Sequence, residues 1–175
     1  MIFETERLRA RDWSPDDAAA VFAIYRDDDV VRFLGSVPTP MRSEDEAAER
    51  IERWRAANAA QPEGYGFWAL ETKDGTLLGA TLVKPLPDAD EVEVGWHLGK
   101  RHWGNGYATE GARGALAHGF GNRPELDTVY AVIYRENAAS VAVANRLGMT
   151  FVGPTDRYYG VTLDLYSRRR NESPG

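Results

Sequence analysis

The 175-residue chain contains no cysteine. Disulfide bonds, thiolate metal ligands and a cysteine nucleophile are therefore excluded, and any catalysis must use oxygen or nitrogen groups. Histidine is scarce as well. The chain has three, His97, His102 and His118, and their spacing matches no standard zinc site, so we expect no bound metal.

Long apolar runs are also missing from the sequence. No stretch approaches the roughly 20 residues that a helix needs to cross a bilayer, and the first residues lack the apolar centre of a signal peptide. A net charge of -6 argues against a general nucleic-acid binder, because phosphate contacts need concentrated lysine and arginine. We expect a soluble, cytoplasmic protein with neither membrane nor nucleic acid among its partners.

The composition is that of an ordinary folded domain. Hydrophobic residues make up 43% of the chain and charged residues 27%, in an interspersed pattern, and the length suits one domain. We therefore expect a single domain at residues 1–167, followed by a polar C-terminal tail at 168–175.

Apolar periodicity predicts the order of the secondary-structure elements. Strands are expected at 7–11, 65–71, 76–84, 91–98, 128–134, 149–152 and 161–166. Helices are expected from the N-cap Ser14 to Tyr25, from Ser43 with its capping-box partner Glu46 to just before Gln61, at 108–120 and at 137–147. This order predicts an α/β (α+β) single domain, with a mixed, mostly antiparallel twisted sheet of about seven strands and helices on both faces.

The most informative stretch is a strand followed by a glycine turn and a helix. On the strand, Glu93 lies on the face opposite Val94 and Trp96. The turn contains Gly104 and Gly106, so backbone N–H groups and the helix N-terminus converge where a pyrophosphate fits. Plain turn chemistry is the alternative. The third glycine of the dinucleotide fingerprint and the G-K-[S/T] of a P-loop are both missing, which argues against a dehydrogenase or a kinase.

Two separated motifs then stand out in the same order as in a known family. The first is R-x-x-G-x-G, from Arg101 to Gly106, and the second is N-x-x-S-x-x-x-x-x-x-L-G, from Asn137 to Gly148. Together they resemble the GNAT superfamily of acetyltransferases. The stretches that further resemble its RimJ/RimL-like branch, named for ribosomal-protein N-acetyltransferases, are Thr5–Arg11, Glu93–Trp96, Trp103–Glu110 and Asn137–Ser140. The resemblance covers nearly the whole chain. It implies a GNAT fold and an acetyl-CoA-dependent N-acetyltransferase that acetylates a primary amine, either a protein N-terminus or a small molecule, by direct attack in a ternary complex.

By this resemblance the cofactor site takes residues from three places. The backbone of the glycine turn would hold the acetyl-CoA pyrophosphate, and the strand before it, which splays from its neighbour in this family, would pair with the pantetheine arm and the acetyl carbonyl. Asn137 would bind that arm or an ordered water, and Ser140 would donate a proton to the departing thiolate. The implied cofactor-binding residues are Val94, Trp96, Leu98, Arg101, His102, Trp103, Gly104, Asn105, Gly106, Tyr107, Ala108, Asn137 and Ser140.

Acetyl transfer also needs an unprotonated amine, and Glu93 is our candidate for the general base. A partly buried carboxylate beside the thioester has a raised pKa, which suits it to take a proton directly or through water. A solvent-facing strand carboxylate is the alternative. For Asn137 the alternative is a helix N-cap without ligand contact. Many GNAT enzymes carry a tyrosine acid where this chain has Ala144, which leaves Ser140 as the stand-in.

Three further points stay open from the sequence. Tyr158 and Tyr159 near the last strands would close an acceptor pocket or belong to the core, and the core is favoured. The Arg168–Arg170 run is most simply a solvated tail, or it lies near the cofactor 3′-phosphate. The alternative function is a non-catalytic acyl-CoA-binding sensor or interaction domain, and exposed strand edges permit a homodimer.

Overall fold

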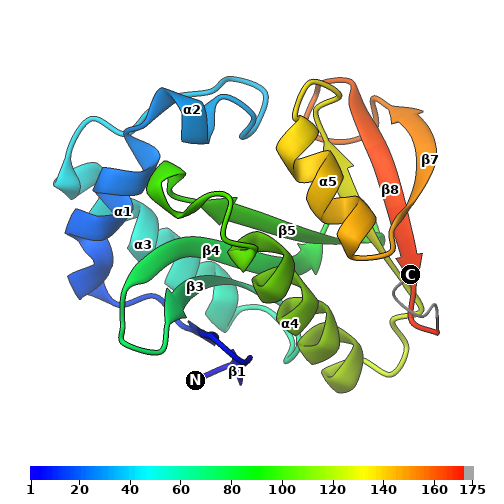
Figure 1. Cartoon of the computed structure of the whole chain (residues 1–175), viewed down its shortest axis with the longest axis horizontal. Coiled ribbons are helices and arrows are strands. Elements are labelled where there is room, and N and C mark those ends of the chain that lie inside the picture. The colour runs from blue at the N-terminus through cyan, green and yellow to red at the C-terminus, as the bar shows by residue number, and fades with distance from the viewer. Residues whose placement is uncertain (172–175) are drawn as a thin grey trace.

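A computed structural model describes residues 1–171, in which eight strands form one sheet (Figure 1). Their order across the sheet is β1-β2-β3-β4-β5-β6-β8-β7, and every neighbouring pair is antiparallel except β5 and β6. The strands are β1 Phe3–Glu4, β2 Leu8–Arg11, β3 Gly66–Thr72, β4 Leu77–Pro85, β5 Val92–Leu98, β6 Thr128–Ile133, β7 Thr150–Thr155 and β8 Leu163–Arg169. The expected mixed, mostly antiparallel sheet is confirmed, and the short β1 is the strand that periodicity did not predict.

Five α-helices connect the strands of the described chain. They are α1 Ala18–Tyr25, α2 Asp28–Val31, α3 Glu44–Ala59, α4 Tyr107–Asn122 and α5 Ala138–Arg146. The four expected helices are all present. The additional helix, α2, begins after Asp27, whose side chain accepts a hydrogen bond from the N–H of Asp29 (2.9 Å). A helix of four residues is too short to show a 3.6-residue period, which explains why the pattern missed it.

The helix starts follow the capping residues of the sequence, with one difference. Ser14 and Asp17 form a capping box around the 3-10 turn Pro15–Asp17 that leads into α1. Ser43 accepts a hydrogen bond from the N–H of Glu46 (3.2 Å), as expected. The Glu46 carboxylate does not return the bond to Ser43, because it accepts from the N–H of Arg42 (2.9 Å) and pairs with Arg50 (3.0 Å).

Helices cover both faces of the sheet (Figure 1), and a hydrophobic core lies beneath the helices on each face. Strand β3 serves both, because its side chains alternate in direction. Trp68 and Leu70 pack in the core beneath α4 and α5, whereas Phe67 and Ala69 pack in the core beneath α1 and α3. The central strands are therefore buried on both sides, and the segment from β3 to β5 lies between the two helix layers.

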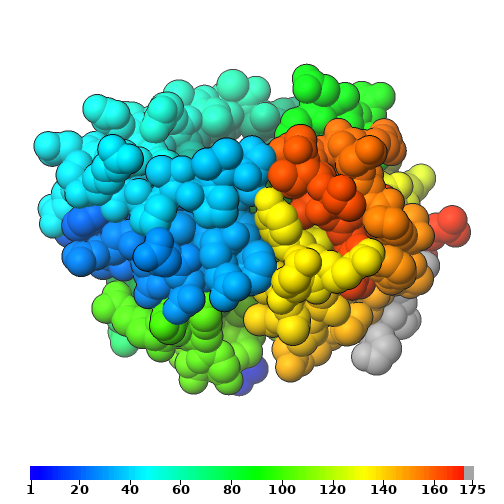
Figure 2. Space-filling model, turned by 90° about the horizontal axis from the view of Figure 1, so that it is seen from above, coloured from blue at the N-terminus to red at the C-terminus, as the bar shows by residue number. Residues whose placement is uncertain are grey.

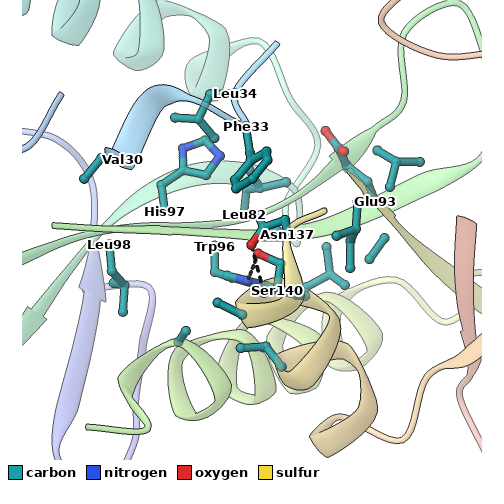
Figure 3. Close-up of a pocket in the computed structure, with 18 of the residues that line it drawn as sticks. Val30, Phe33, Leu34, Leu82, Glu93, Trp96, His97, Leu98, Asn137 and Ser140 are labelled. Carbon is teal, nitrogen blue, oxygen red and sulfur yellow. Dashed lines mark hydrogen bonds between the residues drawn. The ribbon is translucent and has the colours of Figure 1, made fainter. Parts of the chain in front are cut away.

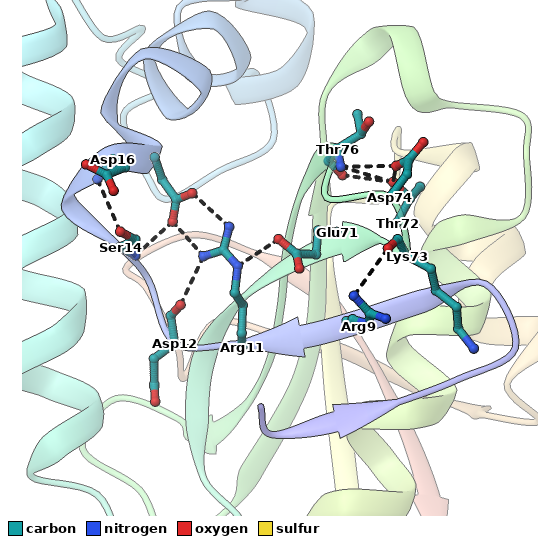
Figure 4. A network of polar contacts seen from close by, with 11 residues as sticks. Arg9, Arg11, Asp12, Ser14, Asp16, Glu71, Thr72, Lys73, Asp74 and Thr76 are labelled. Carbon is teal, nitrogen blue, oxygen red and sulfur yellow. Dashed lines mark hydrogen bonds and ion pairs between the residues drawn. The ribbon is translucent and has the colours of Figure 1, made fainter.

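A partly buried ion network fixes the layer of α1 and α3 to the sheet (Figure 4). Arg11 on β2 donates two hydrogen bonds to Asp17 (both 2.8 Å) and one to Glu71 on β3 (2.7 Å). Asp17 is only 8% exposed and also accepts from the N–H of Ser14 (2.8 Å). One guanidinium thus joins two strands to the turn that starts α1.

The sheet opens between its two parallel strands. Pairing of β5 with β6 is limited to Val92 with Val129 and Glu93 with Tyr130. Beyond Glu93, β5 stays paired with β4 as far as Leu98, while β6 stays paired with β8. The splay that the family resemblance implies is therefore present, and the backbone edge of residues 94–98 faces the gap.

The C-terminal strand corrects the expected domain boundary. β8 continues through Arg169, so residues 168 and 169 belong to the sheet rather than to a tail. Arg170 donates to the carbonyl oxygens of Phe120 (2.7 Å), Arg123 (2.6 Å) and Leu126 (2.8 Å) at the C-terminal end of α4. A charge run on its own does not reveal these carbonyl partners. The rest of the expected tail, 172–175, lies outside the described residues.

Within residues 1–171, each helix is either too short or too polar to cross a bilayer.

Candidate active site

A large cavity occupies the gap between β5 and β6, with a volume of about 1870 Å³. Ligand pockets usually measure roughly 300–1,000 Å³, so this one has room for two substrates. Its walls come from β5, the glycine turn, the start of α4, the start of α5 and the α2 region. All of the predicted site residues line it except Arg101, which is exposed and donates to the ring of His102 (3.0 Å).

The two faces of β5 divide this cavity into two sides (Figure 3). Glu93 and His97 project to the side of α1, α2 and α3, and Trp96 and Leu98 project to the side of α4 and α5. Gly95 lies between Glu93 and His97 on the first side and adds no side chain to it. The strand therefore separates a carboxylate chamber from the chamber that contains the glycine turn.

The glycine turn has the conformation that only glycine adopts readily. Gly104 and Gly106 both have φ of 78°, in the left-handed region. A Cβ at Gly104 would meet nothing within 4 Å, and one at Gly106 would meet only the Arg7 side chain at 3.5 Å. Backbone conformation, and not lack of space, is what requires these glycines, and the room above the turn stays open to a ligand.

The first turn of α4 continues this open surface. Helix N–H groups at 107–110 lack acceptors within the first turn, apart from the Glu110 N–H that bonds the Gly106 carbonyl (3.0 Å). Thr109 is 8% exposed, and its hydroxyl oxygen has no hydrogen-bond partner among the described residues. The free backbone donors and the helix dipole suit a phosphate group, whereas the Thr109 hydroxyl oxygen is buried below that surface.

A clamp from the start of the chain holds the turn in place, and the sequence analysis missed it. Glu110 accepts from the Thr5 hydroxyl (2.7 Å), the Arg7 N–H (2.8 Å) and the Arg7 guanidinium (2.6 Å). Arg7 also donates to the carbonyl of Asn105 (3.1 Å). Burial raises the pKa of Glu110, but the hydrogen bonds from Thr5 and Arg7 outweigh that effect and hold the pKa below its usual value. The carboxylate is therefore ionised and keeps the clamp closed at neutral pH.

The start of α5 brings two predicted residues to the same cavity. Asn137 is the N-cap of α5, where its side-chain oxygen accepts from the N–H of Ser140 (3.1 Å). The indole N–H of Trp96 on β5 donates to the Ser140 hydroxyl oxygen (3.3 Å; Figure 3). Because an indole is a donor only, Ser140 acts as the acceptor and keeps its own proton for another partner.

Glu93 is a buried carboxylate and not a solvent-facing one, since it is 7% exposed. Its Oε1 accepts from the hydroxyl of Tyr159 and lies 3.3 Å from the ammonium nitrogen of Lys84. Burial raises the pKa of Glu93, and the Lys84 charge and the Tyr159 hydrogen bond partly oppose that rise. The structure thus supplies a carboxylate whose affinity for a proton is increased.

His97 lies on the same side as Glu93 but in an aromatic surrounding. Its ring approaches those of Phe67 (5.6 Å) and Tyr25 (6.1 Å), and its Nδ1 lies 3.3 Å from the Tyr25 hydroxyl. Burial lowers the pKa of His97 to about 4, so the ring is neutral at pH 7. Among residues 1–171, three or more His, Asp or Glu side chains nowhere gather in a way that would hold a metal ion.

A segment after α2 roofs the cavity by reaching across to the other half of the sheet (Figure 2). The hydroxyl of Tyr134, just past β6, donates to the carbonyl of Gly35 (2.8 Å), and the Tyr134 and Phe33 rings lie 5.8 Å apart. The space-filling view shows this blue segment in contact with the yellow and orange-red surface of the C-terminal half.

Comparison with known proteins identifies the family of this chain. Residues 7–150 match a family model described as an acetyltransferase (GNAT) domain. The chain belongs to the GNAT family. The uncharacterized protein YkkB of Bacillus subtilis is 30% identical over 171 residues, 94% of each chain. The uncharacterized N-acetyltransferase YoaA of the same organism is 30% identical over 159 residues, 90% of this chain and 87% of its own.

Solved structures agree with the GNAT fold. Mycobacterium smegmatis RimJ in complex with CoA-disulfide has a TM-score of 0.78 at 22% identity, over 97% of this chain and 88% of its own. Membership of the GNAT family makes the chain an acyltransferase. Ala144 on α5, at the position where the resemblance described above implies a tyrosine acid, is fully buried and presents no acid to the cavity.

Proposed function

We propose that this GNAT protein transfers the acetyl group of acetyl-CoA to a primary amine, a protein N-terminus or a small molecule, by direct attack in a ternary complex. One observation carries the proposal: a buried carboxylate and an open phosphate cradle enter the same cavity from opposite sides of β5. Such an arrangement lets two substrates meet at the edge of the strand, and it makes a covalent acetyl-enzyme unnecessary.

Acetyl-CoA fits the side of the cavity that faces α4. The turn at Gly104 and Gly106 and the first N–H groups of α4 would bind the pyrophosphate. The backbone edge of residues 94–98 lies beyond the β5–β6 pairing and would pair with the amides of the pantetheine arm, as an added strand does. At its far end the Leu98 carbonyl already accepts from the Trp103 indole N–H (2.8 Å). The RimJ structure, solved with a CoA-disulfide, supports this assignment.

Each proton of the reaction has a candidate carrier. The amine nitrogen attacks the thioester carbonyl carbon, the carbon–sulfur bond breaks, and an amide and free CoA result. Glu93 takes the proton that leaves the nitrogen, for which burial has prepared it by raising its pKa. Ser140, whose own proton is unused, gives a proton to the sulfur and regains one from solvent, while Glu93 releases to solvent the proton that it took. Asn137 holds the first turn of α5 and thereby positions Ser140.

The test is CoA release from acetyl-CoA by the purified protein against a panel of peptide N-termini and small amines. We expect amine-dependent release with at least one class of acceptor. Glu93→Gln should lower kcat by about a hundredfold and spare acetyl-CoA affinity, because the base is lost and the cradle is not. The matched control is Glu52→Gln, a change of the same kind on the exposed surface of α3.

The rival is a sensor that binds acyl-CoA without turning it over. Tight binding of acetyl-CoA by calorimetry, with no CoA release across the panel, would favour the sensor and contradict the enzyme.

A further inference from the structure

The two oxygens of the Glu93 carboxylate have different surroundings. Both neighbours, the Tyr159 hydroxyl and the Lys84 ammonium, contact Oε1. Oε1 is thus the oxygen that each of them approaches most closely. Because Glu93 is 7% exposed, these two contacts, and not bulk water, decide how the carboxylate is turned.

The contacts on Oε1 come from two separate parts of the fold. Lys84 on β4 is the direct register partner of Glu93 on β5. Tyr159 belongs to the loop between β7 and β8, which the C-terminal half of the sheet supplies. The same loop is anchored a second time, because Arg157 pairs with Glu91 (2.7 Å) just before β5. The loop therefore spans the end of the gap at which β5 and β6 are still paired.

The backbone of Tyr159 has a conformation that residues other than glycine rarely adopt. Its φ is 58°, in the left-handed region. Strained residues of this kind persist when the surroundings fix them, and they concentrate at functional sites. The ring also lies 5.9 Å from the Lys84 ammonium, which brings the loop, β4 and β5 together at one carboxylate.

We propose that Tyr159 and Lys84 are positioning residues that hold Oε1 of Glu93 and leave Oε2 as the oxygen that takes the amine proton. This inference rests on the proposed function, in which Glu93 is the base. The proton passes from the amine nitrogen to Oε2, the nitrogen electron pair forms the bond to the acetyl carbon, and Tyr159 and Lys84 keep their own protons throughout.

Tyr159 remains a donor in this arrangement. Burial, and next the neighbouring Glu93 charge, raise the pKa of the phenol far above its usual value, so it stays protonated at any pH at which the enzyme works. The other titratable or charged groups near Glu93 are Lys84 on β4, Tyr130 opposite it on β6 and the Arg157–Glu91 pair.

The sign of the effect on Glu93 follows from these contacts. A hydrogen bond from Tyr159 and the positive charge of Lys84 both favour the ionised carboxylate, and so oppose the effect of burial on its pKa. Loss of either one should raise the pKa of Glu93 further. The acid limb of the pH profile, where protonation of the base stops turnover, should then move to higher pH.

The decisive variant is Tyr159→Phe, which removes the hydroxyl and keeps the ring. The matched control is Tyr158→Phe, because Tyr158 immediately precedes Tyr159 in the loop and is buried. Its hydroxyl makes no hydrogen bond to Glu93. Two quantities are measured: the pH dependence of kcat/KM for the amine, and the titration of the Glu93 carboxyl carbon by 13C NMR in ligand-free protein. The Glu93 signal is assigned by its disappearance in Glu93→Gln.

We expect Tyr159→Phe to move both the NMR titration and the acid limb to higher pH and to lower kcat at pH 7 on the order of tenfold, with the KM for acetyl-CoA unchanged. Lys84→Met should act in the same direction, and Lys84→Arg should restore the wild-type profile. Tyr158→Phe should leave both pH curves in place.

An unmoved Glu93 titration in Tyr159→Phe, with only the melting temperature lowered, would overturn the proposal by making Tyr159 a structural residue. Because the NMR titration needs no substrate, failure of the proposed function can be distinguished from failure of this inference. If the proposed function fails, Glu93→Gln keeps full turnover even though the titration shifts in Tyr159→Phe. Neither Glu93 as the base nor Oε2 as its proton acceptor would then stand.

Discussion

On the proposed acetyl-CoA side of the cavity, the shape of the turn depends on the backbone conformation of two glycines. Gly104 and Gly106 share a left-handed φ of 78°, and a side chain at either would strain the turn and also occupy the open space above it. The clamp from Arg7 and Glu110 adds to this, because it fixes a turn that has no side-chain cap at its helix start. These contacts hold the turn against the start of the chain.

We expect Gly104→Val and Gly106→Val each to weaken acetyl-CoA binding at least about tenfold, since both the strain and the added volume act at the phosphate site. Isothermal titration calorimetry measures the affinity directly. Gly121→Ala is the control, because Gly121 lies near the far end of α4 with open space around its Cα and an ordinary φ. Wild-type affinity in both valine variants would remove the cradle from the donor site.

Much of the site at the residue scale follows from local pattern. The glycine pair, Glu93 on a strand face and the Asn137 cap are local signals that a sequence carries within a few positions. Tyr159 and Glu93 are 66 positions apart, and Arg7 and Glu110 are 103 apart, so no local pattern joins them. Their pairing depends on sheet order and loop path, which periodicity does not give.

Elements of the fold are placed by a few polar contacts as well as by their apolar faces. Arg11 is the clearest case, because it links β2, β3 and the turn before α1 through Asp17 and Glu71. The N-caps Ser14 and Ser43 were predictable because capping is local, and the longer helices because they show a period. By contrast, β1 and α2 are too short for either signal.

Arg11→Ala should lower the free energy of unfolding by about 3 kcal/mol, because Asp17 would stay buried without its partner. Chemical denaturation with circular dichroism measures the loss. Arg9→Ala is the matched control on the same strand: its pair with Glu4 is long (3.6 Å) and exposed, and should contribute under about 1 kcal/mol. Equal losses in the two variants would mean that burial of the pair is unimportant.

At the scale of the whole molecule, the two halves of the sheet are joined by a short seam and a roof, in addition to the contacts of the β7–β8 loop with Glu91 and Glu93. The seam is the two-residue pairing of β5 with β6, and the roof is the contact of Tyr134 with Gly35 and Phe33. We expect the roof to limit how an acceptor enters, because Phe33 and Leu34 line the cavity on the same side of β5 as His97 and Glu93 (Figure 3).

Tyr134→Phe keeps the ring contact with Phe33 and removes the hydrogen bond to Gly35. We expect faster amide hydrogen exchange at 33–39 and little change at α4, since local opening becomes easier where a tie is lost. Exchange mass spectrometry measures both regions at once, and α4 serves as the internal control. Unchanged exchange at 33–39 would show that the roof is held by packing alone.

The gap between β5 and β6 has a consequence for what the protein must keep out. A strand with unpaired backbone groups attracts any extended chain that can reach it, and this is how sheets aggregate. Most folds carry that hazard on their rims, whereas here it lies in the middle of the sheet, along residues 94–98. We therefore expect the roof to limit which extended chains reach this interior edge.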